Sequence, residues 1–434
     1  MYTEKFDELM ETTELIKKVY FENFKSFVKT ELQIENITTL IGTNAAGKTN
    51  AIEGMRILSE IMSGRDLSAI LDGTKNSDSG IRGGARGCCR FDSDYFVLGC
   101  TVKYDESIDL EYRIKIEVRE RVMVGEEKLS EVSSESSKTM YYTKPADGQS
   151  GDIAVVCNNG QKGRNPDITC IRFSAVISQL ATKLPQERQY GKKIVGYANA
   201  VINPFKNILY LNPETYQMRG YSLVNDTELK VNASNISSVL HALCQEARNK
   251  ELLLDIMQKL PENKILDITF MEGPLNDVIL FLEEKSGKIK EKIDATRLSD
   301  GTLRCLAIVA AVLREKKGGM IVIEEIDNGI HPGRAKTLIH LVSDIARQRG
   351  VDVLITTHNA ILLNALGKED LAGVEIVYRD EEEGDGRFIS LIEIDRMPEL
   401  LANGKLGDVF TSDMILEYIK QDNGTVDDYS WLED

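Results

Sequence analysis

The chain has 434 residues and a formal net charge of −16 at pH 7, from 53 lysines and arginines against 69 aspartates and glutamates. Its length allows two or three domains with a large core, and its 42% apolar and 28% charged residues exclude a disordered or collagen-like chain. Such an acidic surface repels phosphate backbones and anionic membranes except at local basic patches. Sequence-independent coating of DNA is therefore not expected.

Membrane insertion, export and a disulfide or zinc framework are also disfavoured. The longest apolar run, Cys305–Leu313, has nine residues, whereas a membrane span needs about 20. The N-terminal segment alternates charges where a signal peptide would be apolar. The seven cysteines are odd in number and include no CxxC pair. We therefore expect a cytoplasmic protein with reduced thiols.

The N-terminal part predicts a strand, a turn and a helix in succession. Residues 19–24, 31–34 and 38–41 are short β-prone runs separated by turn-like residues. The third run enters a glycine-rich turn, and residues 50–61 then carry apolar side chains at helical spacing.

Further along, residues 95–104 and 110–118 predict an antiparallel meander, and residues 144–167 are rich in turn formers and predict a surface excursion. The C-terminal part alternates helical and apolar runs, which predicts a parallel α/β sheet. Its elements are helices at 302–316 and 334–349 and strands at 320–323 and 353–356.

Residues 42–49 read GTNAAGKT and match G-x-x-x-x-G-K-[ST] between an apolar strand and a helix. Gly42 and Gly47 free the backbone to wrap its N–H groups around phosphate oxygens. In such a loop Lys48 bridges the β- and γ-phosphates and Thr49 offers its hydroxyl to Mg²⁺. The pattern arises by chance in roughly 1 to 2 chains per hundred of this length, and the strand and helix around it make nucleotide binding the prediction.

Residues 320–325, MIVIEE, form an apolar strand that ends in two carboxylates. A buried parallel strand delivers charge to the carboxyl edge of a sheet in this way. Glu324 is predicted to hold a metal, directly or through water, and Glu325 to orient and deprotonate the attacking water. Two ordinary surface glutamates are the alternative, but they would leave the four apolar residues unexplained.

Two weaker signals flank this strand. Residues 298–302, LSDGT, open an apolar-periodic helix, for which Ser299 is an ordinary N-cap. The sharper interpretation is that the Ser299 hydroxyl and the Gly301 amide bind a γ-phosphate. His358 follows the strand VLITT and could bond the γ-phosphate or the attacking water, although a lone histidine at a strand end is usually structural.

Together these motifs, with VYFENFKSF, ITTLIGTNAAGKTNAIEGM, LSDGTLR and EEIDNGIHP, resemble the ABC-type ATPase head of the RecF, SMC and OLD-like branch. That branch includes AAA-type ATP-binding proteins of bacterial antiphage systems. The resemblance implies an α/β fold, an ABC-type P-loop ATPase head with a mixed or parallel sheet, an antiparallel β meander and a mainly helical insertion. We expect head halves at 1–61 and 290–395, a β-meander lobe at 62–175, the helical insertion at 176–289 and an acidic C-terminal tail or helix at 396–434.

The resemblance also implies ATP and Mg²⁺ as cofactors and a homodimer or higher homo-oligomer that encloses two ATP between its heads. Ser299 and Gly301 would then reach the nucleotide of a second subunit, and Asp327 and His331 would lie at the dimer seam. The implied residues are Gly42, Asn44, Gly47, Lys48, Thr49 and Asn50 for the nucleotide, Thr49 and Glu324 for the metal, and Glu325 and His358 for catalysis.

The sequence departs from the family pattern at three points. Asp300 stands where transporters have a second glycine, and Glu324 stands where aspartate is commoner. The glutamine that senses Mg²⁺ in the family has no clear counterpart, and Gln179 and Gln186 are the candidates. Slow turnover is therefore expected.

The resemblance implies an ATPase that gates a separate effector, nuclease-like or toxin-like, in antiphage defence. Only 76 residues follow His358, too few for the nuclease domain that OLD proteins append. A RecF-like DNA-repair ATPase is the alternative, and it would need a basic stripe. Arg82, Arg86 and Arg90 are its best candidates, although a mobile solvated loop or an arginine near the nucleotide phosphates is the favoured explanation of them. Nucleic-acid binding is not indicated by the net charge, membrane contact is not expected, and a transporter ATPase is a remote alternative.

Overall fold

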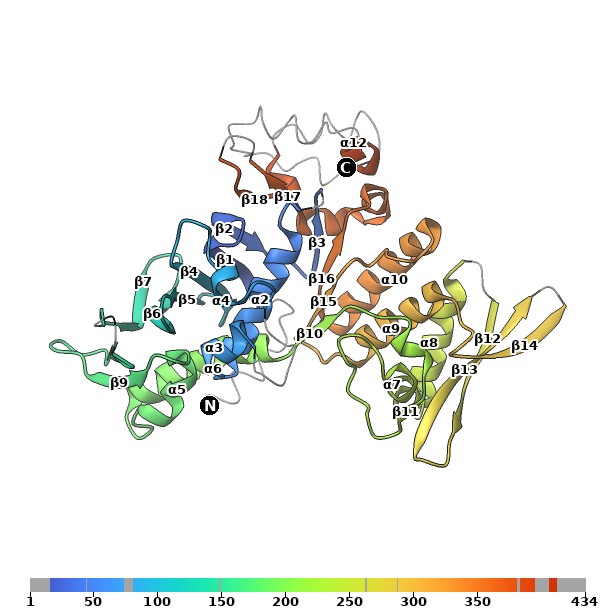
Figure 1. The fold of residues 1–434 in the computed structure, drawn as a ribbon, viewed down its shortest axis with the longest axis horizontal. Coiled ribbons are helices and arrows are strands. Elements are labelled where there is room, and N and C mark those ends of the chain that lie inside the picture. Colours follow the sequence, from blue (N-terminus) through green and yellow to red (C-terminus); the bar gives the residue numbers. More distant parts are fainter. Residues whose placement is uncertain are drawn as a thin grey trace. The chain divides into compact units, whose positions relative to one another are not determined.

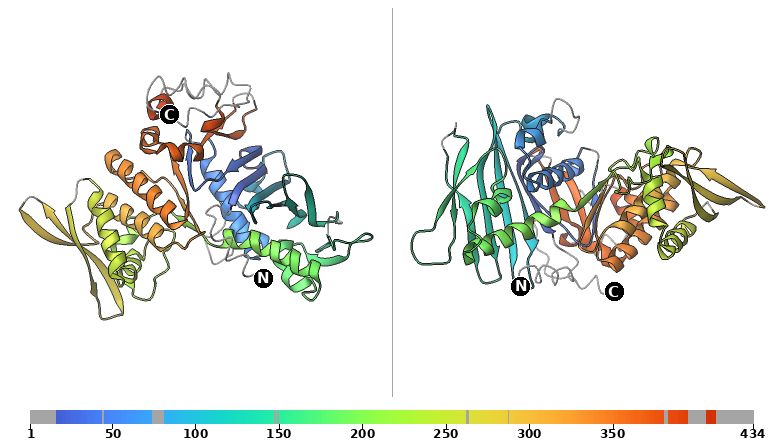
Figure 2. Two further views of the ribbon diagram at one scale, coloured as in Figure 1. Left: turned by 180° about the vertical axis from the view of Figure 1, so that it is seen from behind. Right: turned by 90° about the horizontal axis from the view of Figure 1, so that it is seen from below.

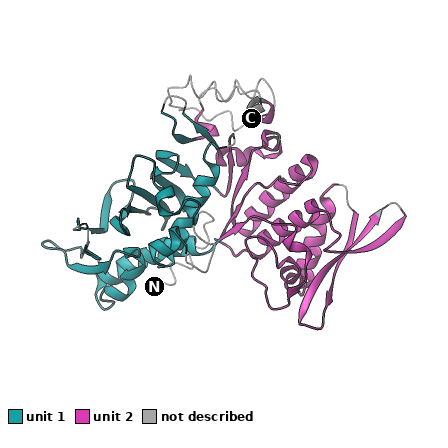
Figure 3. Cartoon of the chain, in the orientation of Figure 1, with its two compact units in different colours: residues 1–35, 43–208, 377–388 teal, residues 36–42, 209–376, 389–434 magenta. Residues whose placement is uncertain are grey.

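The computed structural model describes residues 16–43, 45–73, 81–146, 148, 150–261, 264–286, 288–380, 383–394 and 406–411. The described residues divide into two compact units (Figure 3). Unit 1 takes its residues from 1–35, 43–208 and 377–388, and unit 2 from 36–42, 209–376 and 389–434. None of the described helices is long and apolar enough to cross a lipid bilayer.

Unit 1 is built on an eight-stranded antiparallel sheet with the order β2-β1-β4-β5-β6-β7-β8-β9 (Figure 1). Every second residue of β5 is buried, as expected when one face of a sheet covers a core. The strands are β1 Ile16–Phe24, β2 Phe27–Gln33, β4 Tyr95–Lys103, β5 Asp109–Val118, β6 Val122–Val132, β7 Ser137–Thr143, β8 Asp152–Cys157 and β9 Asp167–Ile171. The helices are α2 Lys48–Met62, α3 Leu67–Leu71, α4 Gly84–Cys88, α5 Val176–Lys183 and α6 Gln189–Lys206.

The predicted surface excursion at residues 144–167 is wrong in its middle part, residues 152–157. The run DIAVVC forms β8, which pairs with β7 on one side and β9 on the other. Turn formers surround this run, but four of its six residues are buried, and it therefore pairs as a strand of the sheet. The meander is confirmed and is longer than the sequence indicated.

A glycine lets α2 lie close to the sheet of unit 1. A Cβ atom at Gly54 would lie 2.4 Å from the ring of Phe21 and 3.2 Å from that of Phe24. The ring of Phe21 also lies 5.2 Å from that of Phe27, centroid to centroid. These buried rings pack against α2, the helix that follows the GTNAAGKT motif.

Two buried charged side chains hold the far end of the same sheet. Arg172, 1% exposed, donates from Nε to the Val124 carbonyl at 2.8 Å and from Nη2 to Glu117 Oε2 at 3.2 Å. The carboxylate of Glu127, 2% exposed, accepts the backbone N–H groups of Val176 and Ile177 at 2.7 Å each. Glu127 therefore caps the N-terminus of α5 from β6.

Unit 2 contains most of a six-stranded sheet with the order β10-β15-β16-β3-β17-β18. Pairing is parallel from β15 through β16 and β3 to β17. All residues of β3, β15 and β16 are buried, as in a parallel sheet covered on both faces. The strands are β3 Ile37–Ile41, β10 Ile208–Leu211, β15 Met320–Ile323, β16 Asp352–Thr357, β17 Val374–Arg379 and β18 Gly386–Ser390.

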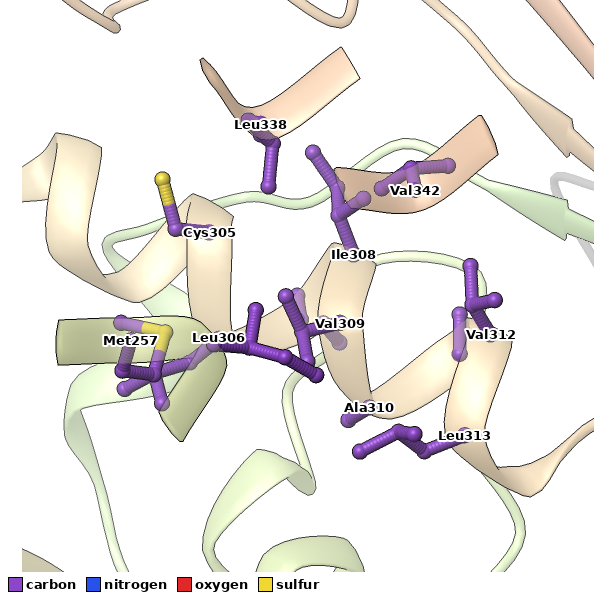
Figure 4. Packing of buried hydrophobic residues seen from close by; sticks show 14 of the residues in the cluster. Met257, Cys305, Leu306, Ile308, Val309, Ala310, Val312, Leu313, Leu338 and Val342 are labelled. Carbon is purple, nitrogen blue, oxygen red and sulfur yellow. The ribbon is translucent and has the colours of Figure 1, made fainter. Parts of the chain in front are cut away.

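Helix α9, Asp300–Arg314, lies at the centre of the unit 2 core, and eleven of its fifteen residues are buried. Figure 4 shows Leu306 and Val309 of α9 near Met257 of α8, with Leu338 and Val342 of α10 on another side. The other helices are α7 Ile236–Leu243, α8 Ala247–Lys259, α10 Pro332–Arg349 and α12 Leu406–Thr411, with 3₁₀ segments η1 Gln217–Arg219, η2 Ala360–Ala365, η3 Lys368–Gly373 and η4 Leu391–Glu393.

A second, antiparallel sheet in unit 2 consists of β11 Ser222–Leu223, β12 Lys264–Glu272, β13 Asp277–Ser286 and β14 Ile289–Asp294. β13 pairs with β12 along one side and with β11 and β14 along the other. Two views show this sheet extending beyond the helices of unit 2 (Figures 1 and 2). The α/β class, with a parallel and an antiparallel sheet, is confirmed.

Glu127 should make the stability of the protein depend on pH. Burial raises the pKa of Glu127 to about 7, although hydrogen bonds from Val176, Tyr141 and Ile177 lower it. Because its ordinary pKa is near 4.5, the folded state holds a proton between about pH 4.5 and 7 that the unfolded state releases. Glu127 therefore makes the free energy of unfolding fall as pH rises through this window, by up to about 1.4 kcal/mol per unit of pKa shift.

Glu127→Gln should reduce this slope, because an amide does not titrate. Urea denaturation of full-length variants from pH 5 to 8 measures it. Glu126→Gln, at the exposed neighbouring position, should keep the wild-type slope. An unchanged slope in Glu127→Gln would contradict the assignment.

Candidate functional site

The motif GTNAAGKT forms a tight turn between β3 and α2. Ala45 has a φ of 65° and Gly47 a φ of 130°, and a Cβ atom at Gly47 would lie 3.0 Å from the ring of Phe27. Only glycine fits that position. Lys48 Nζ donates to the Thr43 carbonyl at 3.0 Å, so the lysine side chain folds back over the turn. Asn44 lies outside the described residues.

The N-terminus of α2 fits an anion. Its N-cap, Gly47, has no side chain with which to cap it, and no residue of the first turn is acidic. The first four N–H groups of a helix lack partners within the helix, and the helix dipole makes this end positive. With Lys48 beside it, this turn offers backbone donors and one cation to a phosphate.

The two residues after Lys48 differ in their surroundings. Thr49 is exposed at the start of α2. The amide of Asn50 donates to Ser26 Oγ at 2.8 Å and so fastens the first turn of α2 to the turn between β1 and β2. Lys25 in that turn also forms an ion pair with Glu53 at 2.6 Å. The sequence assigned Asn50 to the nucleotide, and the structure gives it this structural contact.

Glu324 and Glu325 follow the last residue of β15, as the sequence predicted. Glu324 is half-buried and Glu325 is exposed. Glu325 has a φ of 47°, in the left-handed region that costs a non-glycine residue energy. Its N–H donates to Thr356 Oγ1 at 3.0 Å, and its Oε2 accepts from Asn328 Nδ2 at 3.2 Å. The surrounding structure thus holds Glu325 in a strained, defined position.

The end of β16 supports this turn with two hydroxyls that the sequence analysis missed. Besides the bond from Glu325 to Thr356, Thr357 Oγ1 donates to Asp327 Oδ1 at 2.8 Å and accepts the Asn359 N–H at 3.0 Å. His358 follows and is exposed. Adjacent threonines at the carboxyl end of a buried strand were the only sequence signal for this contact.

Ser299 is the N-cap of α9, which confirms the ordinary interpretation of this serine. Its Oγ accepts the Thr302 N–H at 3.2 Å and lies 2.8 Å from Thr302 Oγ1, which also accepts from Arg334 Nη1 at 3.2 Å. Asp300 in the first turn pairs with Arg219 at 2.6 Å. Hydrogen bonds from Thr215 and Arg219 lower the pKa of Asp300, so this carboxyl is charged at neutral pH.

Within unit 2 the structure brings the start of α9 next to the loop that follows Glu325. A Cβ atom at Gly301 would lie 3.2 Å from the Gly329 carbonyl oxygen. Burial lowers the pKa of Arg304, and the charges of Asp300 and Glu325 oppose that change. Lys48 and Thr49 belong to unit 1, whereas Ser299, Glu324, Glu325 and His358 belong to unit 2.

The remaining sequence candidates have structural contacts. The side-chain amide of Gln179 exchanges two hydrogen bonds with the backbone of Ile171, and Gln186 Nε2 donates to the Ala181 carbonyl at 3.3 Å. Arg86 donates to the Ser93 carbonyl at 2.8 Å, and Arg90 lies 3.7 Å from Asp92. His331 is the N-cap of α10.

Residues 198–364 match a family described as "AAA domain, putative AbiEii toxin, Type IV TA system". This part of the chain is similar to AAA domains of that family. The match includes β15, the start of α9 and His358, confirms the resemblance to ABC-type ATPases, and implies P-loop nucleotide binding. The match covers less than half of the chain and begins after the GTNAAGKT turn, which it does not include. Curated proteins give no match.

Solved structures of SMC heads resemble the chain at low identity. One is an SMC head bound to the C-terminal winged-helix domain of ScpA, with 14% identity, a TM-score of 0.46 and coverage of 87% of this chain and 97% of that one. The SMC head domain from Thermotoga maritima has 14% identity and a TM-score of 0.40, with coverage of 87% of this chain and 98% of that one. A Pyrococcus furiosus SMC head bound to the C-terminal domain of ScpA has 13% identity and a TM-score of 0.46, with coverage of 90% of this chain and 99% of that one.

Removing the hydroxyl that holds Glu325 should weaken this turn. Thr356→Val keeps the shape of the buried side chain but leaves the Glu325 N–H without its acceptor, so we expect a loss of about 1 kcal/mol in the free energy of unfolding. Chemical denaturation measures it. Thr337→Val should cost less, because the Thr337 hydroxyl donates to the Gly333 carbonyl one helical turn earlier and so caps no distant backbone group among the described residues. Equal losses in both variants would contradict the role of Thr356.

Proposed function

We propose that this chain is an ATP-binding and hydrolysing ABC-type ATPase, cytoplasmic, that gates a separate effector protein in antiphage defence. The observation that carries the proposal is the N-terminus of α2, which bears Lys48 and has neither a capping side chain nor an acidic residue in its first turn. The description of the matched family as a putative toxin of a type IV TA system supports a role in defence. The effector would be nuclease-like or toxin-like.

In this proposal the β- and γ-phosphates of ATP lie against the N–H groups at the start of α2. Gly42, Asn44 and Gly47 shape the turn around them, and Lys48 supplies the opposite charge. These donors are fixed before ATP arrives, because Asn50 fastens the helix to its support. Pre-ordered donors bind charge without a further cost of reorganisation.

Hydrolysis in this proposal depends on the carboxylates after β15. Mg²⁺ bound through Thr49 and Glu324 would neutralise charge that develops on the phosphates. Glu325 orients and deprotonates the attacking water, and His358 donates to the γ-phosphate. The strained backbone of Glu325 supports this assignment, since such strain clusters at functional sites.

The proposed working unit is a homodimer, or a higher homo-oligomer, that encloses two ATP. Ser299 and Gly301 contact the γ-phosphate held by a second copy. In support, Ser299 is exposed at the N-terminus of a fifteen-residue helix. Asp300 partly offsets the positive end of that helix, which agrees with slow turnover.

Lys48→Ala should abolish ATP-dependent self-association, because it removes the lysine proposed to supply positive charge to the β- and γ-phosphates. Light scattering of the full chain with ATP and Mg²⁺ measures the association. Lys183→Ala, a matched change at an exposed lysine of α5, should associate like the wild type. ATP affinity and assembly that are both unaltered in Lys48→Ala would refute the phosphate-binding assignment.

Glu325→Gln should separate binding from hydrolysis. The amide keeps the size of the side chain but cannot take a proton, so turnover should fall about 100-fold or more while ATP stays bound. Phosphate release measures turnover, and a filter assay measures retained ATP. Glu251→Gln on the exposed face of α8 serves as the control. A wild-type rate of turnover in Glu325→Gln would show that another residue is the catalytic base.

A further inference from the structure

Arg334, in the first turn of α10, is a buried cation that has no counter-charge in the part of the chain that the structure describes. The residue is 3% exposed, and no described carboxylate lies within ion-pair distance of it. Nη1 donates to Thr302 Oγ1 at 3.2 Å, whereas Nε and Nη2 are buried and have no hydrogen-bond partner among the described residues. Arginine keeps its proton in proteins, so burial does not neutralise it. An isolated buried charge strongly destabilises a fold.

The place of Arg334 in its helix increases this cost. Helix α10 begins at Pro332 after its N-cap His331, and no residue of its first turn is acidic. The N-terminus of a helix is its positive end, so a cation there is unfavourable. The helix end and the side chain together leave an excess of positive charge inside unit 2, which indicates that an anion binds nearby.

The Arg334 side chain is aimed at the start of α9. A Cβ atom at Gly301 would lie 3.9 Å from Arg334 Nη1. Thr302 Oγ1, which accepts from Arg334, lies 2.8 Å from Ser299 Oγ, and Ser299 is exposed. Because a guanidinium only donates, its charge favours the arrangement in which the two hydroxyl hydrogens point away from it. The exposed Ser299 hydroxyl is thereby oriented as a donor to an anion.

The acidic residue in the first turn of α9 does not supply the counter-charge. Asp300 pairs with Arg219 at 2.6 Å, and its side chain is 58% exposed. Water and salt screen an exposed charge far more than a buried one. Asp300 therefore acts on the solvent side of this turn, and the interior side stays positive.

We propose that a phosphate group bound at the start of α9 is the counter-charge of Arg334, and that this group is the γ-phosphate of ATP held by a second copy. A phosphate suits the site because its several oxygens accept from helix N–H groups and a hydroxyl together. Arg334 is a positioning residue here, since it reaches the anion through Thr302 and Ser299. The assignment to ATP rests on the proposed function, whereas the phosphate site itself does not.

Arg334→Met tests the missing counter-charge. Methionine is a long apolar side chain, so the variant should raise the melting temperature of the ligand-free full chain by removing an unpaired buried charge. Arg172→Met is the matched control, because Arg172 is also buried but donates to the Val124 carbonyl and pairs with Glu117. The control should lower the melting temperature. Equal losses in the two variants would overturn the proposal.

Inorganic phosphate tests the site separately from the phosphate loop. In the Lys48→Ala chain, phosphate should raise the melting temperature above that in sodium chloride of equal ionic strength, because it binds only the folded state. Adding Arg334→Gln should abolish this rise, since glutamine can donate to Thr302 but carries no charge. Adding Arg334→Lys instead should keep most of it. Equal rises with glutamine and lysine at this position would show that the charge is not used and would overturn the proposal.

Self-association with ATP and Mg²⁺ tests the assignment to a second copy. Arg334→Gln should weaken the ATP-dependent dimer by about tenfold or more, while the affinity of the single chain for ATP stays at the wild-type value. A wild-type dimer in Arg334→Gln, with loss of the dimer in Lys48→Ala, would overturn the role of Arg334 and leave the proposed function standing. Failure of the wild type to associate would overturn the assignment to ATP, and the phosphate measurement would still decide whether the site exists.

Discussion

The arrangement of unit 2 depends on the pairing of β3. This five-residue strand lies between β16 and β17, which come more than 300 residues later in the chain. The side-chain amide of Asn36, just before β3, donates at 3.0 Å to the Val351 carbonyl and to Asp352 Oδ1. Because β3 leads directly into the GTNAAGKT turn, the same pairing fixes where that turn begins. Strands β15 and β16 end at the same edge of the sheet, and there they present Glu324, Glu325 and the supporting threonines.

The parallel strands were predicted well from the sequence, because a strand buried on both faces must be apolar throughout. Met320–Ile323 is both the predicted and the observed extent of β15. Helix α10 ends at a left-handed glycine, Gly350, and begins with a proline, two signals that are readable from sequence alone. The strand β8 was missed because turn-forming residues on both sides outweighed its six-residue run.

Side-chain partners were harder to predict than elements. Thr356 contacts Glu325 only because β16 lies beside β15, and Lys264, Lys285 and Lys290 lie opposite one another only in the register that β12, β13 and β14 adopt. A bulge between Ile265 and Asp267 shifts that register by one residue. Without the bulge, Lys264 would face a different neighbour. Local patterns do not encode such shifts, so the sequence motifs could be located but the side chains that contact them could not.

Gln179 shows how unit 1 ends its sheet. β9 is the last strand, and its outer edge would expose unpaired backbone groups. At Ile171 the side-chain amide of Gln179 occupies both of them, accepting the N–H at 3.0 Å and donating to the carbonyl at 2.9 Å. The side-chain amide thus makes the two hydrogen bonds that one residue of a further strand would make. A β-strand from another molecule would have to displace this amide before it could extend the sheet. The Gln179 side chain therefore protects the edge of β9 against edge-to-edge aggregation.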